Sequence, residues 1–265
     1  MPPVVSRLFR IWLRMAAMSL QAQLSHKLGS LGFLVGKLIR LLFFFAYLLA
    51  IFRHTDKVAG YSLLEISLFF LTFNLVDITA QVFLRGVYAA RHLVTEGDLD
   101  TYLIQPCPPL LRMIGLSVDF LDIVTLLPVL ILLGLTWDRL PQSITALHCL
   151  AYFILVLNGI AIAFAIHIFV ASLAVRTQEL ENTIWVYRDM MFLGKLPVDI
   201  YAGPLRWALT FLIPIAVMTS FPTKALLGTL EFRWMVFAVG LAAVLLGLSS
   251  LAWRSALKHY TSISS

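Results

Sequence analysis

Long uninterrupted apolar runs are the feature that most constrains this chain. Leu41–Phe52 and Ile123–Leu135 contain no charged residue. A lipid-facing β-strand would alternate apolar and polar side chains, so continuous runs favour helices. Only 13% of the residues are charged, about half of the ~25% typical of soluble domains. We therefore expect an all-α membrane protein, which excludes a disulfide scaffold, a disordered tail and an ordinary soluble enzyme.

The chain length sets the number of spans. A membrane-spanning helix uses about 20 residues, so 265 residues hold about six such helices with their loops. The sequence predicts five spans at residues 28–52, 62–84, 113–136, 143–175 and 234–253. The longest clearly polar stretch, residues 85–112, connects the second span to the third.

The position of the remaining span is open from the residues alone. Residues 205–221 are the more apolar choice, whereas residues 179–196 are moderately apolar and contain several charges. The alternative makes 179–196 the span and folds residues 204–222 back as a re-entrant hairpin. Non-helical backbone is tolerated at membrane depth where protein surrounds it. Both arrangements therefore accommodate the prolines that interrupt this region, Pro197, Pro204, Pro214 and Pro222.

Residues 1–27 precede the first span, and most of them have the pattern of an amphipathic helix. Arg7, Arg10 and Arg14 recur at helical spacing on one face, and Trp12 lies among apolar residues on the other. Such a helix suits the membrane interface. The alternative is a helix packed against a soluble partner.

The net charge of +6 is explained better by membrane orientation than by nucleic-acid binding. Lys and Arg are enriched on the cytoplasmic side of spans. With both termini in the cytoplasm, twelve of the 20 Lys and Arg residues fall inside, seven fall outside, and Arg188 lies in a span. We expect a multi-pass protein with both termini cytoplasmic and no nucleic-acid partner.

Motifs for catalysis and metal binding are absent from the sequence. It contains no phosphate-binding G-x-x-x-x-G-K-[ST] loop, no H-E-x-x-H and no G-x-S-x-G. Cys107 and Cys149 give no disulfide framework. Asp119 and Asp122 share a helix face, where a metal site or a carboxylate pair competes with the favoured interpretation that they face water or a neighbouring group. We predict no catalytic residues, no metal site and no cofactor in this chain.

A few ionisable residues lie within the predicted spans. Such groups are costly in hydrocarbon and usually face the bundle interior or a water path. They either line a substrate path or make structural hydrogen bonds between helices, and the two interpretations weigh equally. The residues are Glu65, Asp77, His167, Arg188 and Asp189.

Three segments resemble the permease subunits of type-2 ABC exporters, in particular the drug-export-like branch of bacteria. TEGDLDTYLIQPCPPLL resembles the family pattern E-G-[DE]-L-D-x-Y-L-x-x-P-x-[NP]-P-L. KLPVDIYAGPLRWALTFLIPIAVMTSFPTKALLG is similar to a second pattern, although Leu196 replaces the usual Tyr and the second proline falls one step later, at Pro204. The tail WRSALKHYTSISS is similar to W-R-x-G-L-R-x-Y-x-S-A-S.

The resemblance implies a permease in a bacterial inner membrane that works with two copies of a cytosolic ATPase and with a second copy or a related permease. ATP and Mg would belong to the ATPase, and the cargo would be hydrophobic, amphiphilic or lipid-linked. Residues 1–27 would be the interface helix, and the proline-rich segment 204–222 a re-entrant hairpin after a span at 179–196. The helix that couples the permease to the ATPase would use Glu96, Gly97, Asp98, Leu99, Asp100, Tyr102, Leu103 and Pro106.

In this interpretation Gly97 permits a tight turn, and Leu99, Tyr102 and Leu103 form an apolar ridge that docks into the ATPase. Rival functions are an ion-driven secondary transporter using Glu65, Asp77 or His167, an intramembrane enzyme, and a non-transporting signalling or assembly subunit. The first would need inverted repeats, and the second a clustered catalytic constellation.

Overall fold

The computed structural model describes residues 4–115, 117–141, 143–177 and 183–260. Within these ranges the protein is helical and has no β-sheet. Five helical segments are long and apolar enough to cross a membrane, and a bent helix pair raises the number to six if it counts as one span. The five are α2 (Lys27–Phe52), α3 with its extension (Leu63–Thr95), α7 (Phe120–Asp138), α8 (Ala146–Thr177) and α12 (Phe232–Lys258). The protein is therefore an all-α membrane protein, as expected.

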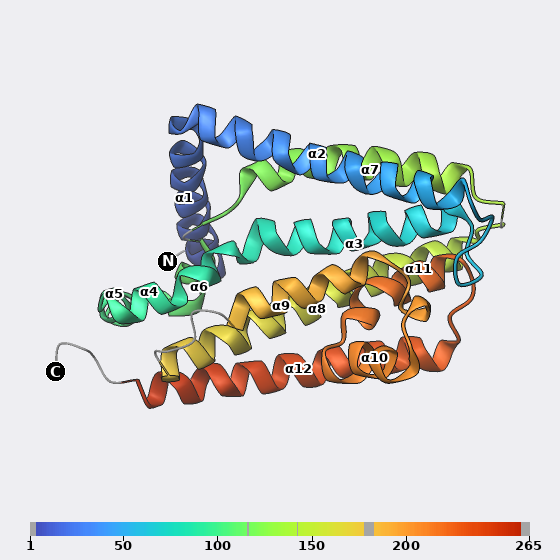
Figure 1. Cartoon of the computed structure of the whole chain (residues 1–265). Coiled ribbons are helices and arrows are strands. Elements are labelled where there is room, and N and C mark those ends of the chain that lie inside the picture. The colour runs from blue at the N-terminus through green and yellow to red at the C-terminus, as the bar shows by residue number, and fades with distance from the viewer. Residues whose placement is uncertain (1–3, 116, 142, 178–182, 261–265) are drawn as a thin grey trace.

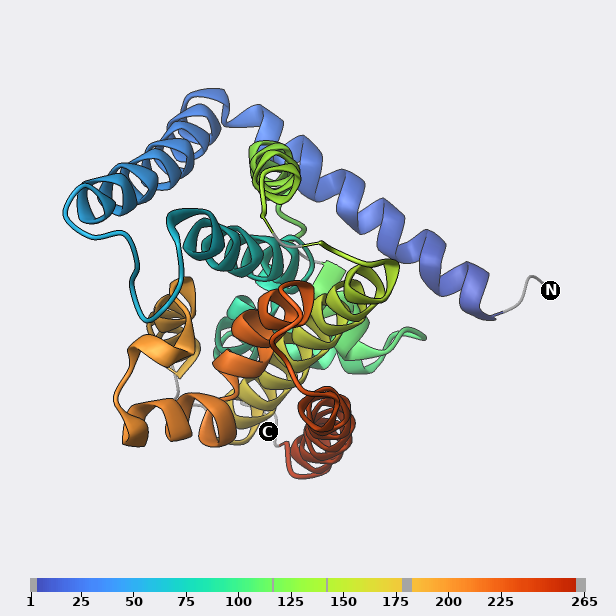
Figure 2. The same ribbon diagram turned by 90° about the vertical axis from the view of Figure 1, so that its right-hand side faces the viewer.

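The long helices run side by side, and α1 (Val4–Ser25) lies across them (Figures 1 and 2). The short helices α4 (Ala90–Thr95), α5 (Asp98–Leu103) and α6 (Pro109–Gly115) lie at the same end of the bundle as α1. The last turns of α12 also reach this end, which we name the α5 end (Figure 1). A helix perpendicular to the spans is the arrangement expected of one that lies in a membrane interface.

The predicted third span begins too early in the sequence. Residues 109–115 form the separate helix α6, and α7 begins only at Phe120. The cause is Asp119, whose carboxylate accepts hydrogen bonds from the backbone N–H groups of Leu121 (3.0 Å) and Asp122 (3.2 Å). This is the geometry of a helix N-cap, so Asp119 starts the helix instead of lying within it.

The predicted fifth span, 179–196, is described from residue 183 onward, and residues 179–182 lie outside the described residues. The described part forms α9 (Thr183–Met191) and a 3-10 turn, η2 (Phe192–Lys195). These 13 residues extend about 20 Å at ~1.5 Å per residue, less than the ~30 Å hydrocarbon core. This stretch is accordingly not among the five long spans.

Two short helical arms follow, bent by 83° with respect to each other. The first contains α10 (Gly203–Trp207) and the π-turn η4 (Ala208–Leu212), and the second contains the π-turn η5 (Ala216–Ser220) and α11 (Phe221–Leu226). Pro204 and Pro222 lie in the first turns of α10 and α11, where a missing N–H costs little. Pro214 lies in the bend, and Pro197 precedes the short 3-10 helix η3 (Val198–Ile200). We name this unit, residues 203–226, the bent pair.

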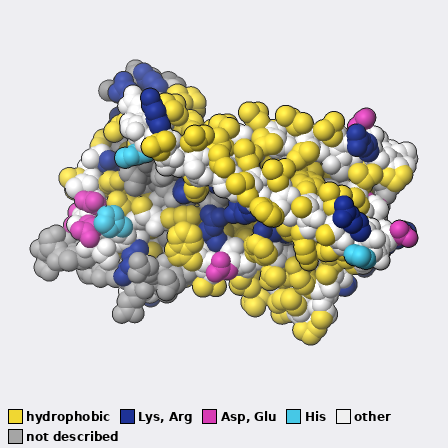
Figure 3. All heavy atoms as spheres, turned by 45° about the horizontal axis from the view of Figure 1, so that its top comes forward, with side chains coloured by type: hydrophobic (Ala, Val, Ile, Leu, Met, Phe, Trp, Pro, Cys, Tyr) yellow, Lys and Arg dark blue, Asp and Glu magenta, His cyan; other side chains and the backbone are white. Residues whose placement is uncertain are grey.

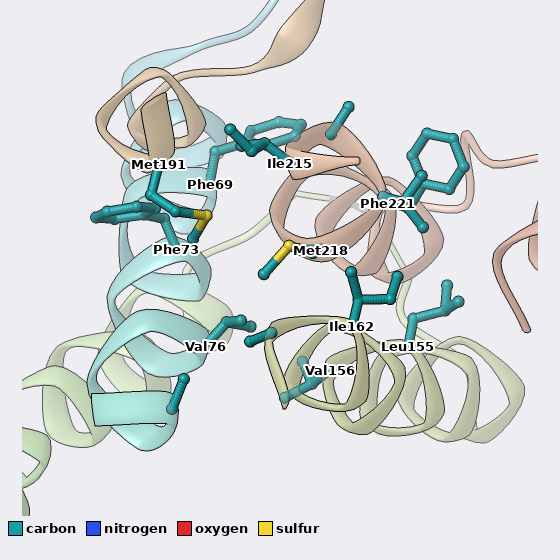
Figure 4. Close-up of a cluster of buried hydrophobic side chains, with 14 of the residues drawn as sticks. Phe69, Phe73, Val76, Leu155, Val156, Ile162, Met191, Ile215, Met218 and Phe221 are labelled. Carbon is teal, nitrogen blue, oxygen red and sulfur yellow. The ribbon is translucent and has the colours of Figure 1, made fainter. Parts of the chain in front are cut away.

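The second arm of the bent pair is packed into the centre of the protein, whereas α10 in the first arm is exposed. Met218 and Ile215 lie between Phe69 and Phe73 of α3 and Ile162 of α8 (Figure 4). All five residues of η5 are buried, so its irregular backbone is surrounded by protein, as membrane depth demands. At Gly159 of α8, an added Cβ would stand 2.6 Å from the Met218 carbonyl oxygen, so only glycine permits this close approach.

Candidate functional site

Helices α4 and α5 form a compact cap at one end of the bundle. The chain turns between them at Gly97, whose φ of +77° lies in the left-handed region that glycine adopts at little cost. The predicted tight turn is therefore present at Gly97. Glu96, the last residue before the turn, is exposed.

The ridge predicted to dock into a partner is directed mostly inward. Leu99 is fully buried and Tyr102 is 8% exposed. Both belong to a cluster with Val175 of α8 and Trp253 of α12, and the Arg112 guanidinium stacks on the Tyr102 ring at 4.2 Å. The prediction that Leu99 and Tyr102 are contact residues is therefore wrong in its geometry. Their i, i+3 spacing turns both side chains into this cluster, which holds α5 against its neighbours α4 and α6.

The outward surface of α5 uses other residues. Leu103 is 40% exposed and Ile104 is 84% exposed. Asp98 and Pro106 are exposed beside them, whereas Asp100 is partly buried. Sequence reasoning missed Ile104, because spacing shows which residues share a face but not which face is packed. We name the exposed set of Asp98, Leu103, Ile104 and Pro106 the α5 surface.

The interface helix α1 is tied to the links on both sides of α6. The Arg7 guanidinium donates to the Pro106 carbonyl at 3.2 Å. Further along, the hydroxyl of Ser19 (2.9 Å) and the amide of Gln23 (2.7 Å) donate to the Val118 carbonyl. The Trp12 ring lies 6.3 Å from the Phe83 ring of α3. Arg10 and Arg14 are exposed. Helix α1 is therefore attached to the bundle and keeps basic side chains at its surface.

A buried ion network joins α2 to the start of α7. Lys37 pairs with Asp122 and, at 3.8 Å, with Asp119. Arg85, just after α3, pairs with Asp119. Both carboxylates are buried, and the Phe33 ring lies 4.2 Å from the Lys37 ammonium and 5.1 Å from the Arg85 guanidinium. Asp119 and Asp122 are thus structural partners of two cations, not an acid–base pair facing water.

A polar groove of about 430 Å³ opens beside this network, between α2, α3 and α9. Asp77 and Arg188 line it, together with Arg40 and Tyr88. The Arg188 guanidinium donates to the Tyr88 hydroxyl at 3.3 Å, and that hydroxyl donates to the Gln81 side-chain oxygen at 2.8 Å. Figure 3 shows Lys and Arg side chains gathered in the middle of a largely apolar face. We name the groove of about 430 Å³ the α2–α9 groove.

The structure brings together only two of the five residues predicted to line a path. Glu65 caps the start of α3 by accepting from the Ser62 backbone N–H at 2.8 Å. His167 is buried in α8, where its ring stacks on Tyr88 at 5.7 Å and its Nδ1 contacts the Ala163 carbonyl oxygen at 2.7 Å. Asp189 is exposed on α9 and does not line the groove. Asp77 and Arg188 are the two predicted residues that line the groove together.

The described residues contain no group of three or more His, Cys, Asp or Glu side chains that could hold a metal ion. Cys107 and Cys149 both carry free thiols. The arrangement offers instead an outward apolar surface at one end and a charged groove along the bundle.

Comparison with known proteins identifies the family. The model of the ABC-2 family transporter proteins matches residues 38–264, which contain the α5 surface, the bent pair and most of the groove lining. No curated protein and no solved structure gives a match. With more than half of its length matched, the chain belongs to the ABC-2 family of transporter proteins, the membrane components of transport systems.

Proposed function

We propose that the protein is the permease subunit of an ATP-driven exporter that moves a hydrophobic, amphiphilic or lipid-linked cargo out of the cytoplasm. Two copies of a separate cytosolic ATPase would hydrolyse ATP with Mg, because this chain has no phosphate-binding loop. A second copy of the chain or a related permease would complete the transporter. We do not place any catalytic step in this protein.

The observation that carries the proposal is how α5 is mounted. Its outer side exposes Ile104 and Leu103, and its inner side places Leu99 and Tyr102 in the buried cluster that also contains residues of α4, α6, α8 and α12. A partner that binds the exposed residues and moves would therefore act, through α4 and the shared buried cluster, on α8, which runs the length of the bundle. The acidic side chains of Asp98 in the α5 surface and of the nearby exposed Glu96 favour a basic partner surface.

The proposal also implies an orientation in the membrane. An ATPase requires the α5 end in the cytoplasm, and we place the start of α1 and the end of α12 there with it, in a bacterial inner membrane. Arg10 and Arg14 on the exposed side of α1 support this placement, because basic side chains are attracted to the anionic cytoplasmic leaflet. The bent pair then lies toward the outer side, as a re-entrant hairpin before the last span.

The test is affinity purification of the full chain from membranes in a mild detergent, followed by identification of co-purifying ATPase. Ile104→Asp is expected to abolish ATPase recovery, because a charge replaces the most exposed apolar residue of the α5 surface. Ile104→Leu keeps the apolar bulk and is the matched control. Recovery of the ATPase at wild-type yield with folded Ile104→Asp protein contradicts the proposed docking surface. Failure to recover any ATPase with the wild-type chain contradicts the proposed function.

A further inference from the structure

We propose that the α2–α9 groove binds the phosphate-like anionic headgroup of an amphiphile, and that this amphiphile is the cargo. The second part rests on the proposed function, whereas the binding step stands on the groove itself. The groove adjoins a narrower cavity of about 70 Å³ that shares Lys37, Arg40, Asp77 and Arg188 with it. We treat the two neighbouring spaces together as the site.

The charges along this site do not balance. The cations Lys37, Arg40, Arg85, Arg188 and Lys195 outnumber the carboxylates Asp77, Asp119 and Asp122. Asp119 and Asp122 are already committed to Arg85 and Lys37. Asp77 is then the one described carboxylate left at the site for the other three cations.

These three cations come from both sides of the groove and have no ion pair among the described residues. Arg40 extends from α2, whereas Arg188 and Lys195 extend from α9 and η2. Lys195 is buried, with its ammonium 3.3 Å from the centre of the Phe192 ring. Like charges that converge in an apolar setting repel each other and lose solvation. An anion between them relieves both costs, so the geometry favours an anionic ligand.

The walls of the site suit the remainder of an amphiphile. The narrower part is lined by apolar side chains from α2, α3, α7 and α9, namely Leu38, Leu41, Phe70, Phe73, Val129 and Met191. A free anion would leave this wall unused. A ligand with an alkyl chain would bury apolar area against it, which is favourable in proportion to the area removed from water.

A larger pocket adjoins the groove on the side of α1. It has a volume of about 630 Å³ and is lined by Met15, Met18 and Ala22 of α1. It shares Phe33 and Arg85 with the groove. The proposal therefore assigns the approach of the amphiphile to the side of α1, the helix expected to lie in the membrane interface.

The binding test uses the purified full chain in a neutral maltoside detergent, without any ATPase. Titration calorimetry with dodecyl phosphate is compared with dodecyltrimethylammonium, which has the same chain and the opposite charge. We expect binding of the phosphate and none of the ammonium. Arg40→Gln is expected to weaken dodecyl phosphate binding about tenfold, the loss of one charge-assisted hydrogen bond. Arg40 is exposed, so its replacement leaves the packing intact.

Arg139→Gln, an exposed cation after α7 and away from the groove, is the matched control and should bind as the wild type does. Equal binding of the two amphiphiles, or unchanged binding by both Arg40→Gln and Arg188→Gln, overturns the proposal. Competition by inorganic phosphate identifies the source. If inorganic phosphate displaces dodecyl phosphate at a similar concentration, the ligand is a free anion from solution and the amphiphile proposal is overturned. If inorganic phosphate does not displace it, the result supports a membrane ligand. No ATPase is present in the binding test. A negative binding result therefore leaves the co-purification result unaffected, and a negative co-purification result leaves the binding result unaffected.

Discussion

Arg7 donates a hydrogen bond to the backbone carbonyl of Pro106 at 3.2 Å, across 99 positions of sequence. The bond joins the interface helix α1 to the segment that follows α5. Movement of the α5 surface is thereby linked to a helix expected to lie in the membrane interface. This contact gives the proposed coupling end a lateral anchor in addition to the buried cluster that contains Leu99 and Tyr102.

Loss of this anchor should weaken coupling without unfolding the protein. We predict that Arg7→Gln lowers the ATPase stimulation by the permease about twofold to fivefold, because an exposed hydrogen bond lies at the low end of the ~0.5–1.5 kcal/mol range. The measurement is ATP hydrolysis by the reconstituted complex. Arg14→Gln on the same helix is the control, since Arg14 is exposed and is not hydrogen-bonded to the described part of the bundle. Equal effects of the two substitutions would show that only the charge of α1 matters.

Alanine substitutions at Leu99 and Ile104 should differ in their effect on the free energy of unfolding. Leu99→Ala removes a fully buried side chain and is expected to lower the free energy of unfolding by about 2–5 kcal/mol. Ile104→Ala, at an 84% exposed position, should change it by less than about 0.5 kcal/mol. Thermal denaturation in detergent compares the two. Similar melting temperatures for both variants would contradict the inward packing of α5.

The close approach of α8 to the bent pair predicts a strong effect of one methyl group. Gly159→Ala places a Cβ against the Met218 carbonyl and should cost about 1–3 kcal/mol through overpacking. Gly134→Ala in α7 meets no atom within 4 Å and should be neutral or stabilise by up to about 1 kcal/mol. The check is again thermal denaturation. A Gly159→Ala variant as stable as Gly134→Ala would mean that the bent pair is not packed on α8.

Asp199 lies outside the long spans and pairs with one residue of each arm of the bent pair. Its carboxylate accepts from the Tyr61 hydroxyl at 3.0 Å and pairs with Lys224 at 2.6 Å and Arg206 at 3.8 Å. Burial alone would raise the pKa of Asp199, but the hydrogen bond and charge of Lys224, with smaller contributions from Tyr61 and Arg206, hold this pKa below its usual 3.8. Because the folded pKa is lowered, the stabilisation is present above pH 3.8 and is lost as the pH falls through the folded value.

We therefore predict that acidification below about pH 4 loosens the bent pair, and that Asp199→Asn reproduces this state at neutral pH with a cost on the order of 1 kcal/mol. Trp207 and Trp234 line the adjacent pocket of about 330 Å³, so their fluorescence is the measurement. Asp138→Asn, at the exposed last residue of α7, should leave the acid transition unchanged. An acid transition that survives in Asp199→Asn would assign it to another group.

Apolar runs and prolines predicted much of this fold. Uninterrupted hydrophobic stretches in water-free surroundings form helices because the backbone satisfies its own hydrogen bonds, so α2, α3, α8 and α12 follow from the sequence. The start of α7 did not, because the capping role of Asp119 depends on its local backbone. Glu65 was likewise interpreted as a path residue, although Ser62, three positions before it, supplied the signature of a capping box.

The candidate site was less predictable. The motif around Gly97 placed α5 correctly, but which side of α5 faces the bundle depends on α8 and α12, far away in sequence. The narrower cavity beside the groove depends on Arg40, Arg188 and Lys195 meeting from separate helices. Spacing within one helix carries no information about such a meeting.

The most direct measurement of the central claim is transport of a fluorescent anionic lipid analogue by proteoliposomes that contain the permease, with and without its co-purified ATPase. The account predicts movement that requires both ATP and the ATPase and that is lost in Ile104→Asp. Transport that persists without the ATPase, driven by an ion gradient and abolished by Asp77→Asn, would contradict the account and favour an ion-driven carrier.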